Sequence, residues 1–222
     1  MSPSWLNARR WYLRRRHLAA PIAELVAARL PAVSSPVDAA EFVCLDIETT
    51  GLDAATADML SVGWVVIRAG KVDLSTAESH IVRPTGGVGD SASVHGLTDT
   101  VVGEGLDWGI ALDKIVRVLA GRILVVHHAG LDKALLDRMC LRRFGVRLPV
   151  PVIDTLVLEH RRRRRNHHLE TRNSLRLSDL RDEYRLPRYL AHDCLVDAIS
   201  TAELLLAMVA HRQALRLADL LS

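Results

Sequence analysis

The stretch LDIETTGLD, at residues 45–53, decides the fold and points to the chemistry. Its first residues end the apolar run FVCLDI (42–47), which is typical of a buried strand. Alternate residues of a strand point to the same face, so the side chains of Asp46 and Glu48 leave the sheet together. Oxygen-only ligands of this kind suit Mg²⁺ or Mn²⁺ rather than Zn²⁺. Alone, the pattern would also fit a turn aspartate followed by an exposed glutamate.

The residues around this stretch predict an α/β domain with a mixed β-sheet flanked by helices. Strands at 60–67 and 71–82 follow, with Ala69-Gly70 as the hairpin turn between them. Helices and strands then alternate, as they do in α/β folds. The further predicted elements are a helix at 108–119, a strand at 123–126, a helix at 131–144, a strand at 149–153, a helix at 155–164, a basic loop at 161–176 and a helix at 193–212.

Three later residues are candidates for the same site. Asp132 lies in the first turn of its predicted helix, where the usual explanation of an aspartate is a helix cap. In HDCLVDAISTAELLL (192–206), we place His192 on the loop before the last helix and Asp193 at the cap position. Asp197 then lies one turn inside an apolar helix, where a carboxylate costs free energy unless it is paired or bound to a metal.

Together, these four acids and one histidine resemble the motifs of the DEDDh 3′–5′ exonucleases, the family of the proofreading epsilon subunit of bacterial DNA polymerase III. The resemblance runs over about residues 41–211. LDIETTGLD corresponds to the first motif, HHAGLDKALL (127–136) to the second and HDCLVDAISTAELLL to the third. The stretches SVHGLTD (93–99) and VIDTLVLEH (152–160) are similar to auxiliary segments of the family.

The resemblance implies a ribonuclease H-like fold and a 3′–5′ exonuclease that releases nucleoside 5′-monophosphates. Asp46, Glu48 and Asp197 would hold two divalent cations, Mg²⁺ or Mn²⁺, and Asp132 would complete the site, partly through water. The cations would clamp the attacking water and the leaving 3′ oxygen of the terminal phosphodiester. His192 would act as the general base that takes the proton of this water.

The resemblance also implies a pocket for the terminal nucleotide. In the family, the residues at the positions of Thr49 and Gly51 offer backbone groups to this nucleotide, and Leu52 lies beneath its base. His95 lies near the same pocket. His128 stands where the family usually has asparagine, so one hydrogen bond to the substrate is in question, whereas no metal ligand is.

Composition and charge are compatible with an enzyme that acts on a polyanion. The chain of 222 residues is 49% hydrophobic and 25% charged, which excludes disorder for most of it. Residues 1–40 carry six arginines against two acids, and residues 159–188 carry ten arginines against five acids. An acidic site beside basic segments is expected of such an enzyme. We hypothesise that Arg161–Arg165 track the nucleic-acid backbone; a basic outer helix face is the alternative.

The chain divides into two predicted parts. Residues 1–40 form an Arg-rich helical extension and linker, and residues 41–215 form the exonuclease domain. The extension contains Trp5, Trp11 and Tyr12, which either form a contact patch for a DNA polymerase or another protein or pack back on the domain. The three cysteines of the chain, Cys44, Cys140 and Cys194, have neither disulfide nor zinc spacing, and no apolar run of the chain is long enough for a membrane span, so we expect a cytoplasmic protein.

The predicted partner is nucleic acid with a free 3′ end, with single-stranded DNA favoured and RNA as an alternative. Proofreading or DNA repair would be the corresponding role. Other interpretations are an RNA-trimming ribonuclease, a polymerase-associated subunit and a catalytically idle module that only binds. A zinc hydrolase is disfavoured because the pairs His127-His128 and His167-His168 lack the i, i+4 spacing of zinc ligands.

Overall fold

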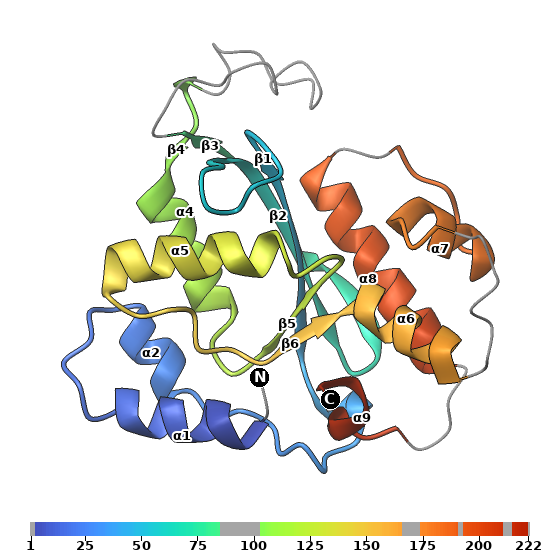
Figure 1. Ribbon diagram of the computed structural model, residues 1–222, viewed down its shortest axis with the longest axis horizontal. Helices are drawn as coiled ribbons and strands as arrows, with labels where there is room; N and C mark the ends of the chain where they lie inside the picture. The colour runs from blue at the N-terminus through green and yellow to red at the C-terminus, as the bar shows by residue number, and fades with distance from the viewer. Residues whose placement is uncertain (1–2, 85–102, 166–173, 191–192, 211–214, 222) are drawn as a thin grey trace.

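The structure of the protein is a computed structural model that describes residues 3–84, 103–165, 174–190, 193–210 and 215–221. Within these residues, the middle layer is a six-stranded mixed sheet of order β4-β3-β2-β1-β5-β6 (Figure 1). The strands are β1 (Phe42–Thr49), β2 (Met59–Arg68), β3 (Lys71–Arg83), β4 (Leu106–Asp107), β5 (Ile123–Val126) and β6 (Val152–Asp154). The first three form an antiparallel meander, whereas β5 pairs parallel with β1 and β6. The predicted α/β class with a mixed sheet is confirmed.

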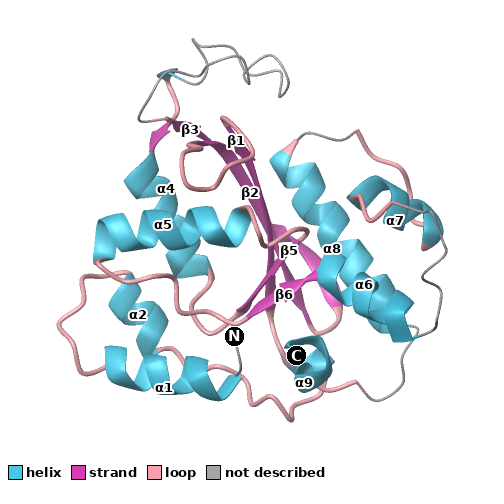
Figure 2. Ribbon diagram, viewed as in Figure 1, coloured by secondary structure: helices cyan, strands magenta, loops and turns pink. Residues whose placement is uncertain are grey.

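Helices cover both faces of this sheet (Figure 2). One face carries α1 (Pro3–Leu13), α2 (Ile22–Ala27), α4 (Trp108–Val118) and α5 (Asp132–Phe144). The other face carries α6 (Thr155–Arg165), α7 (Leu177–Glu183), α8 (Cys194–Ala210) and α9 (Leu217–Leu221). A short 3₁₀ helix at Val37–Ala39 precedes β1. Each face of the sheet has its own apolar core.

The two rows of side chains on β1 face different cores. Cys44 packs in the core on the α8 side. Because strand side chains alternate, Asp46 and Glu48 continue the same row. Ile47, between the two acids, packs in the core on the α4 and α5 side. The strand therefore presents both carboxylates to α8, and Ile47 packs on the opposite face of the sheet.

Residues with a left-handed backbone conformation follow β2 and α5, where two of the predicted elements end. The backbone at Ala69 and Gly70 has φ values of 49° and 69°, which form the primed type of hairpin turn that suits the twist of β2 and β3. At the end of α5, Gly145 has φ 70°, and its amide donates to the Leu141 carbonyl at 3.0 Å. The predicted hairpin and the predicted helix over 131–144 are both confirmed.

The N-terminal helices are part of the packed structure. Their apolar side chains join the core on the α4 and α5 side: Leu13, Ile22, Leu25 and Val26. Arg10 is only 3% exposed, and burial followed by the charge of Arg14 lowers its pKa to about 10. Its guanidinium donates to four backbone carbonyls at 2.7–3.2 Å: Pro149, Leu25, Val26 and Ala28. These bonds tie α1 to α2 and to the segment before β6.

Part of the predicted basic loop is helical. Residues 161–165 form the last turn of α6, so the predicted helix over 155–164 is confirmed and the overlapping prediction of a loop from residue 161 is wrong there. Residues 166–173 lie outside the described part of the chain. Glu159 accepts from Arg162 at 2.6 and 2.8 Å and from Arg163 at 3.0 Å. These contacts one turn apart stabilise the helix and engage two of the five arginines that we expected to face nucleic acid.

None of the helices in the described ranges combines the length and the apolar character that crossing a bilayer requires.

Candidate metal centre and substrate groove

Three carboxylates converge where β1 meets α8. Asp46 and Glu48 come from the end of β1, and Asp197 comes from the first turn of α8. One carboxylate oxygen from each lies within 4.8 Å of the others. Glu48 is only 8% exposed. Asp46 and Asp197 are half-buried. Such a cluster of mutually repelling carboxylates supplies oxygen ligands only, which is the donor set of a hard divalent cation.

Close contact between α8 and the sheet depends on Gly63. This residue lies opposite Asp46 in the antiparallel register of β1 and β2. A Cβ atom on Gly63 would clash with the backbone nitrogen of Leu195 and lie 2.6 Å from the carbonyl carbon of Cys194. Glycine at this position therefore lets the first turn of α8, which carries Asp197, lie directly on the sheet.

The start of α8 is fixed by a side-chain cap. Asp193 Oδ1 accepts from the amides of Leu195 and Val196, both at 3.0 Å. The amide of Asp197 donates to the Asp193 carbonyl at 2.8 Å. The predicted cap is confirmed, and it sets the rotation of the turn that carries Asp197.

Asp132 lies beside this trio, in the first turn of α5, and is only 5% exposed. Burial, followed by the charges of Asp154 and Glu48, raises its pKa to about 8. Burial and then the charges of Asp132, Asp197, Glu48 and Asp193 raise the pKa of Asp46 well above its ordinary value. The four predicted acids are therefore brought together, and bound cations would relieve their repulsion.

The raised pKa of Asp132 predicts a stability that falls as pH rises when no metal is bound. Between the ordinary pKa of 3.8 and about 8, the folded state binds the proton that the unfolded state has released. The free energy of unfolding should fall by up to about 1.4 kcal/mol per pH unit in this interval. Thermal unfolding in EDTA at several pH values measures this, and the Asp132→Asn variant should show a smaller dependence, the remainder being due to Asp46, whose pKa is also raised. Stability independent of pH in the wild-type protein would contradict the expectation, and added Mn²⁺ should stabilise most at high pH.

Sequence reasoning missed Asp154, which organises the loop between β5 and α5. Its carboxylate accepts from the amides of His128 at 3.2 Å and Ala129 at 2.8 Å, and it also caps α6 through the amide of Leu156 at 3.0 Å. His128 has φ 92°, a conformation that asparagine adopts more readily than most residues. The available signal was an aspartate between a predicted strand and a predicted helix, the usual position of a cap.

The imidazole ring of His127 is held by hydrogen bonds within the fold. Its Nδ1 lies 2.8 Å from Thr155 Oγ1, and its Nε2 lies 2.9 Å from the carbonyl oxygen of Leu175. Burial lowers its pKa, which favours the neutral ring with Nε2 as the donor to this carbonyl. Both ring nitrogens are engaged, so this histidine is not placed to be the zinc ligand that the alternative interpretation required.

A groove of about 1030 Å³ opens beside the carboxylates, and Asp197, His128 and Leu52 are among its lining residues. The side chain of Leu52 is 92% exposed. Thr49 Oγ1 donates to the Gly51 carbonyl at 2.6 Å, which shapes the turn directly after Glu48. Of the residues predicted to bind the terminal nucleotide, Leu52 and His128 line this groove, and Thr49 and Gly51 lie in the turn that leads to Leu52. His95 and the predicted base His192 lie outside the described residues.

Comparison with known proteins identifies the family of the chain. A family model described as RNase_T, exonuclease, matches residues 43–205. The chain belongs to this exonuclease family. With its four acids in place, it is a DEDDh-type exonuclease, and the prediction from its motifs is confirmed.

Curated relatives of the exonuclease include DNA polymerases III of the PolC type. The protein from Thermotoga petrophila is 28% identical over 177 residues, which cover 79% of the chain. The protein from Caldanaerobacter subterraneus is 25% identical over 169 residues, which cover 76%. The chain spans only 12% of the length of each of these relatives.

Solved structures confirm the ribonuclease H-like fold. Exonuclease X in complex with 5′ overhanging duplex DNA has a TM-score of 0.60 at 23% identity, over 82% of this chain and 99% of that one. Escherichia coli exonuclease I with a 5cy-dT13 oligonucleotide has a TM-score of 0.63 at 14% identity, over 81% and 42% of the two chains. Cell-death related nuclease 4 has a TM-score of 0.62 at 15% identity, over 77% and 64%.

Proposed function

We propose that this exonuclease removes nucleoside 5′-monophosphates from the 3′ end of single-stranded nucleic acid, with DNA favoured over RNA. The observation that carries the proposal is the carboxylate cluster of Asp46, Glu48 and Asp197, of which Asp197 lines the groove. The exonuclease family of the chain and the DNA bound in similar structures support it. A role in proofreading or repair beside a polymerase is part of the same proposal, in line with the PolC-type relatives.

The donor set fits two Mg²⁺ or Mn²⁺ ions. Asp46, Glu48 and Asp197 would hold them directly, and Asp132 would act partly through water. Such ions, when bound, stabilise the charge on the attacking and leaving oxygens of a phosphodiester.

His192 is the proposed general base. It directly precedes Asp193, whose capping bonds fix the start of α8. Its imidazole would accept the proton of the attacking water at one ring nitrogen, a task that suits a group with a pKa near neutral pH. The leaving 3′ oxygen would take a proton from solvent.

The groove offers contacts for the terminal nucleotide and the strand behind it. We propose that the backbone at Thr49 and Gly51 binds the terminal nucleotide, and that the exposed side chain of Leu52 lies under its base. His95 and His128 complete the proposed pocket. A Cβ on Gly51 would meet no atom within 4 Å, so the space beside it is open for a substrate.

Arg176 is the better candidate for a phosphate contact than the arginines of α6, because it lines the groove and is exposed. Arg176→Gln should weaken single-stranded DNA binding and lower the slope of log Kd against log salt by about 0.7. Fluorescence anisotropy in EDTA, at several salt concentrations, measures the slope. Arg185→Gln is the matched control, since Arg185 is exposed nearby but does not line the groove. Equal slopes in the wild type and Arg176→Gln would refute the contact.

The proposed domain division places the exonuclease domain at residues 41–215 and a helical extension at 1–40 that binds a partner protein. The linker pairs with the C-terminal segment: the Val37 amide donates to the Leu215 carbonyl at 3.3 Å, and the Leu217 amide donates to the Ser35 carbonyl at 3.1 Å. These bonds join the extension to the C-terminal segment, and the N-terminal helices share the core on the α4 and α5 side, so the two proposed parts pack against each other.

The decisive experiment uses 5′-labelled single-stranded DNA and RNA of one sequence. Each is incubated with Mg²⁺, Mn²⁺ or EDTA. The proposal expects a metal-dependent ladder that shortens from the 3′ end, with DNA degraded faster than RNA. A ladder on RNA alone would support the trimming ribonuclease instead, and no ladder with any metal would overturn the proposed activity.

A further inference from the structure

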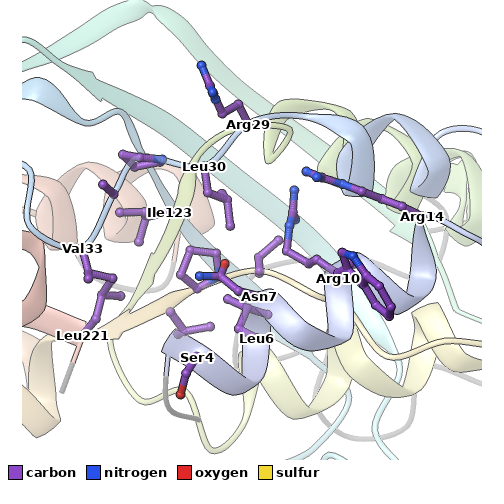
Figure 3. Close-up of a pocket in the computed structure, with 16 residues that line it drawn as sticks. Ser4, Leu6, Asn7, Arg10, Arg14, Arg29, Leu30, Val33, Ile123 and Leu221 are labelled. Atoms are coloured by element: carbon purple, nitrogen blue, oxygen red, sulfur yellow. The ribbon is translucent and has the colours of Figure 1, made fainter.

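A second cavity, of about 720 Å³, lies under α1 (Figure 3). Residue Ile123, at the start of β5, lines this cavity, whereas His127, just after the end of β5, lines the groove. The cavity therefore lies at the opposite end of this strand from the groove. Its volume is within the range of pockets that enclose organic ligands or side chains of a partner.

Aliphatic side chains form one side of the cavity. They come from α1, the segment after α2, the starts of β5 and β6, and α9: Leu6, Leu30, Val33, Ile123, Val152 and Leu221. Figure 3 shows Val33, Ile123 and Leu221 together on one side. Such a surface gains free energy when an apolar group replaces water on it.

Three arginines also line the cavity. Figure 3 shows Arg10 and Arg14 on the side away from Val33 and Leu221, and Arg29 at the top of the view. No aspartate or glutamate is found among the described residues that line the cavity. Backbone carbonyls engage Arg10, and Arg14 donates through Nε to the Val26 carbonyl at 2.9 Å. Arg29 and Arg14 are exposed, and within the described part of the chain only the Nε of Arg14, among their guanidinium nitrogens, has a hydrogen-bond partner. These arginines therefore favour an anion.

Exposed aromatic residues extend the surface beyond the cavity. Trp5, Trp11 and Tyr12 on α1 are 49%, 58% and 57% exposed. The guanidinium of Arg15 lies 3.3 Å from the ring centroid of Trp11, which itself lines the cavity. Tryptophan, tyrosine and arginine are enriched at the centres of protein interfaces. A surface wider than the cavity fits a macromolecule better than a small ligand.

The positive charge of the N-terminal segment indicates which class of macromolecule the surface binds. Residues 1–23 contain five arginines and no acid, so an acidic partner is favoured. Nucleic acid would satisfy the arginines, but its flat bases and phosphates do not fill an aliphatic cavity. We propose that this surface binds an acidic peptide segment of a partner protein, with an apolar side chain in the cavity and carboxylates at Arg14 and Arg29.

Selection of peptides tests this proposal independently of the exonuclease activity. A phage-displayed library of random 12-residue peptides is panned on the immobilised full chain. We expect enrichment of peptides in which aspartate or glutamate flanks leucine, isoleucine or phenylalanine. Fluorescein-labelled copies of enriched peptides should then bind in solution, as measured by fluorescence anisotropy.

Variants with matched charge decide whether the cavity is the binding site. Arg29→Glu should weaken peptide binding by about tenfold or more, as expected for reversal of a charge at an interface. Arg16→Glu changes the net charge equally, but Arg16 does not line the cavity, so its affinity should stay within about twofold of the wild type. Both arginines are exposed, and both variants should keep the wild-type Tm and the wild-type exonuclease ladder.

Three outcomes would overturn the proposal. One is that no peptide is enriched above background. Another is that the two variants weaken binding equally, which would indicate general attraction to a basic surface. The third is that Arg29→Glu weakens the binding of labelled single-stranded DNA in EDTA but does not weaken the binding of any peptide. The surface would then be a binding site for nucleic acid.

Discussion

Asp46→Asn is expected to abolish the exonuclease activity and to stabilise the metal-free protein at neutral pH. Asp46 is one of the three clustered carboxylates, and loss of a metal ligand should cost about 10³-fold or more in rate. The same change removes a charge that burial and four neighbouring acids disfavour. A residue that is needed for activity but costs stability is typical of functional sites.

Cleavage of a 5′-labelled oligonucleotide and thermal unfolding in EDTA measure the two effects of Asp46→Asn. Asp113→Asn provides the contrast, because Asp113 lies 2.7 Å from Arg143 in an ion pair outside the site. That variant should keep its activity and lose stability. If the Asp46→Asn protein is active, then Asp46 is not a metal ligand. If this variant is less stable than the wild type in EDTA, then repulsion among the acids does not destabilise the metal-free protein.

Gly63→Ala is expected to lower activity by about 100-fold, because a misplacement of about 1 Å at a reacting centre has that effect. The new methyl group would meet the backbone of Cys194 and Leu195, which cannot rotate away as a side chain can. The first turn of α8 must then move off the sheet, and it takes Asp197 away from Asp46. We therefore expect weaker Mn²⁺ binding together with the loss of rate.

Calorimetric titration with Mn²⁺ separates positioning from simple destabilisation. Val62→Ala is the matched control, because Val62 precedes Gly63 on β2 but packs in the core on the other face. It should lower the Tm and leave the Mn²⁺ affinity unchanged. If Gly63→Ala loses stability without losing Mn²⁺ affinity, then Gly63 does not position Asp197.

Local patterns predicted the elements that position the metal centre. The apolar run before Asp46, the turn at Ala69-Gly70 and the cap at Asp193 each depend on residues close in the chain, and the structure has them where expected. The grouping of the four acids came from resemblance to a family. From its position in the sequence alone, Asp132 would be interpreted as a helix cap. Only the fold shows that it lies beside β1.

The features that sequence reasoning missed depend on contacts between distant segments. Nothing local distinguishes Gly63 from any glycine in a strand, because its role is defined by a helix that begins about 130 residues later. Asp154 gives a weak local signal, but its bonds to the loop before α5 need the parallel pairing of β5 and β6. In contrast, the pairing of Glu159 with Arg162 and Arg163 followed from helical spacing and could have been predicted.

The shortness of β5 has a consequence for how two partners could be held at once. Its four residues separate the cavity under α1 from the groove, a span of about 13 Å along the strand. A protein bound in the cavity that also holds nucleic acid would keep a 3′ end at a millimolar effective concentration near the carboxylates, on the scale of about 1 mM for short tethers. The rate of trimming would then depend on the geometry of the complex rather than on the intrinsic affinity of the groove.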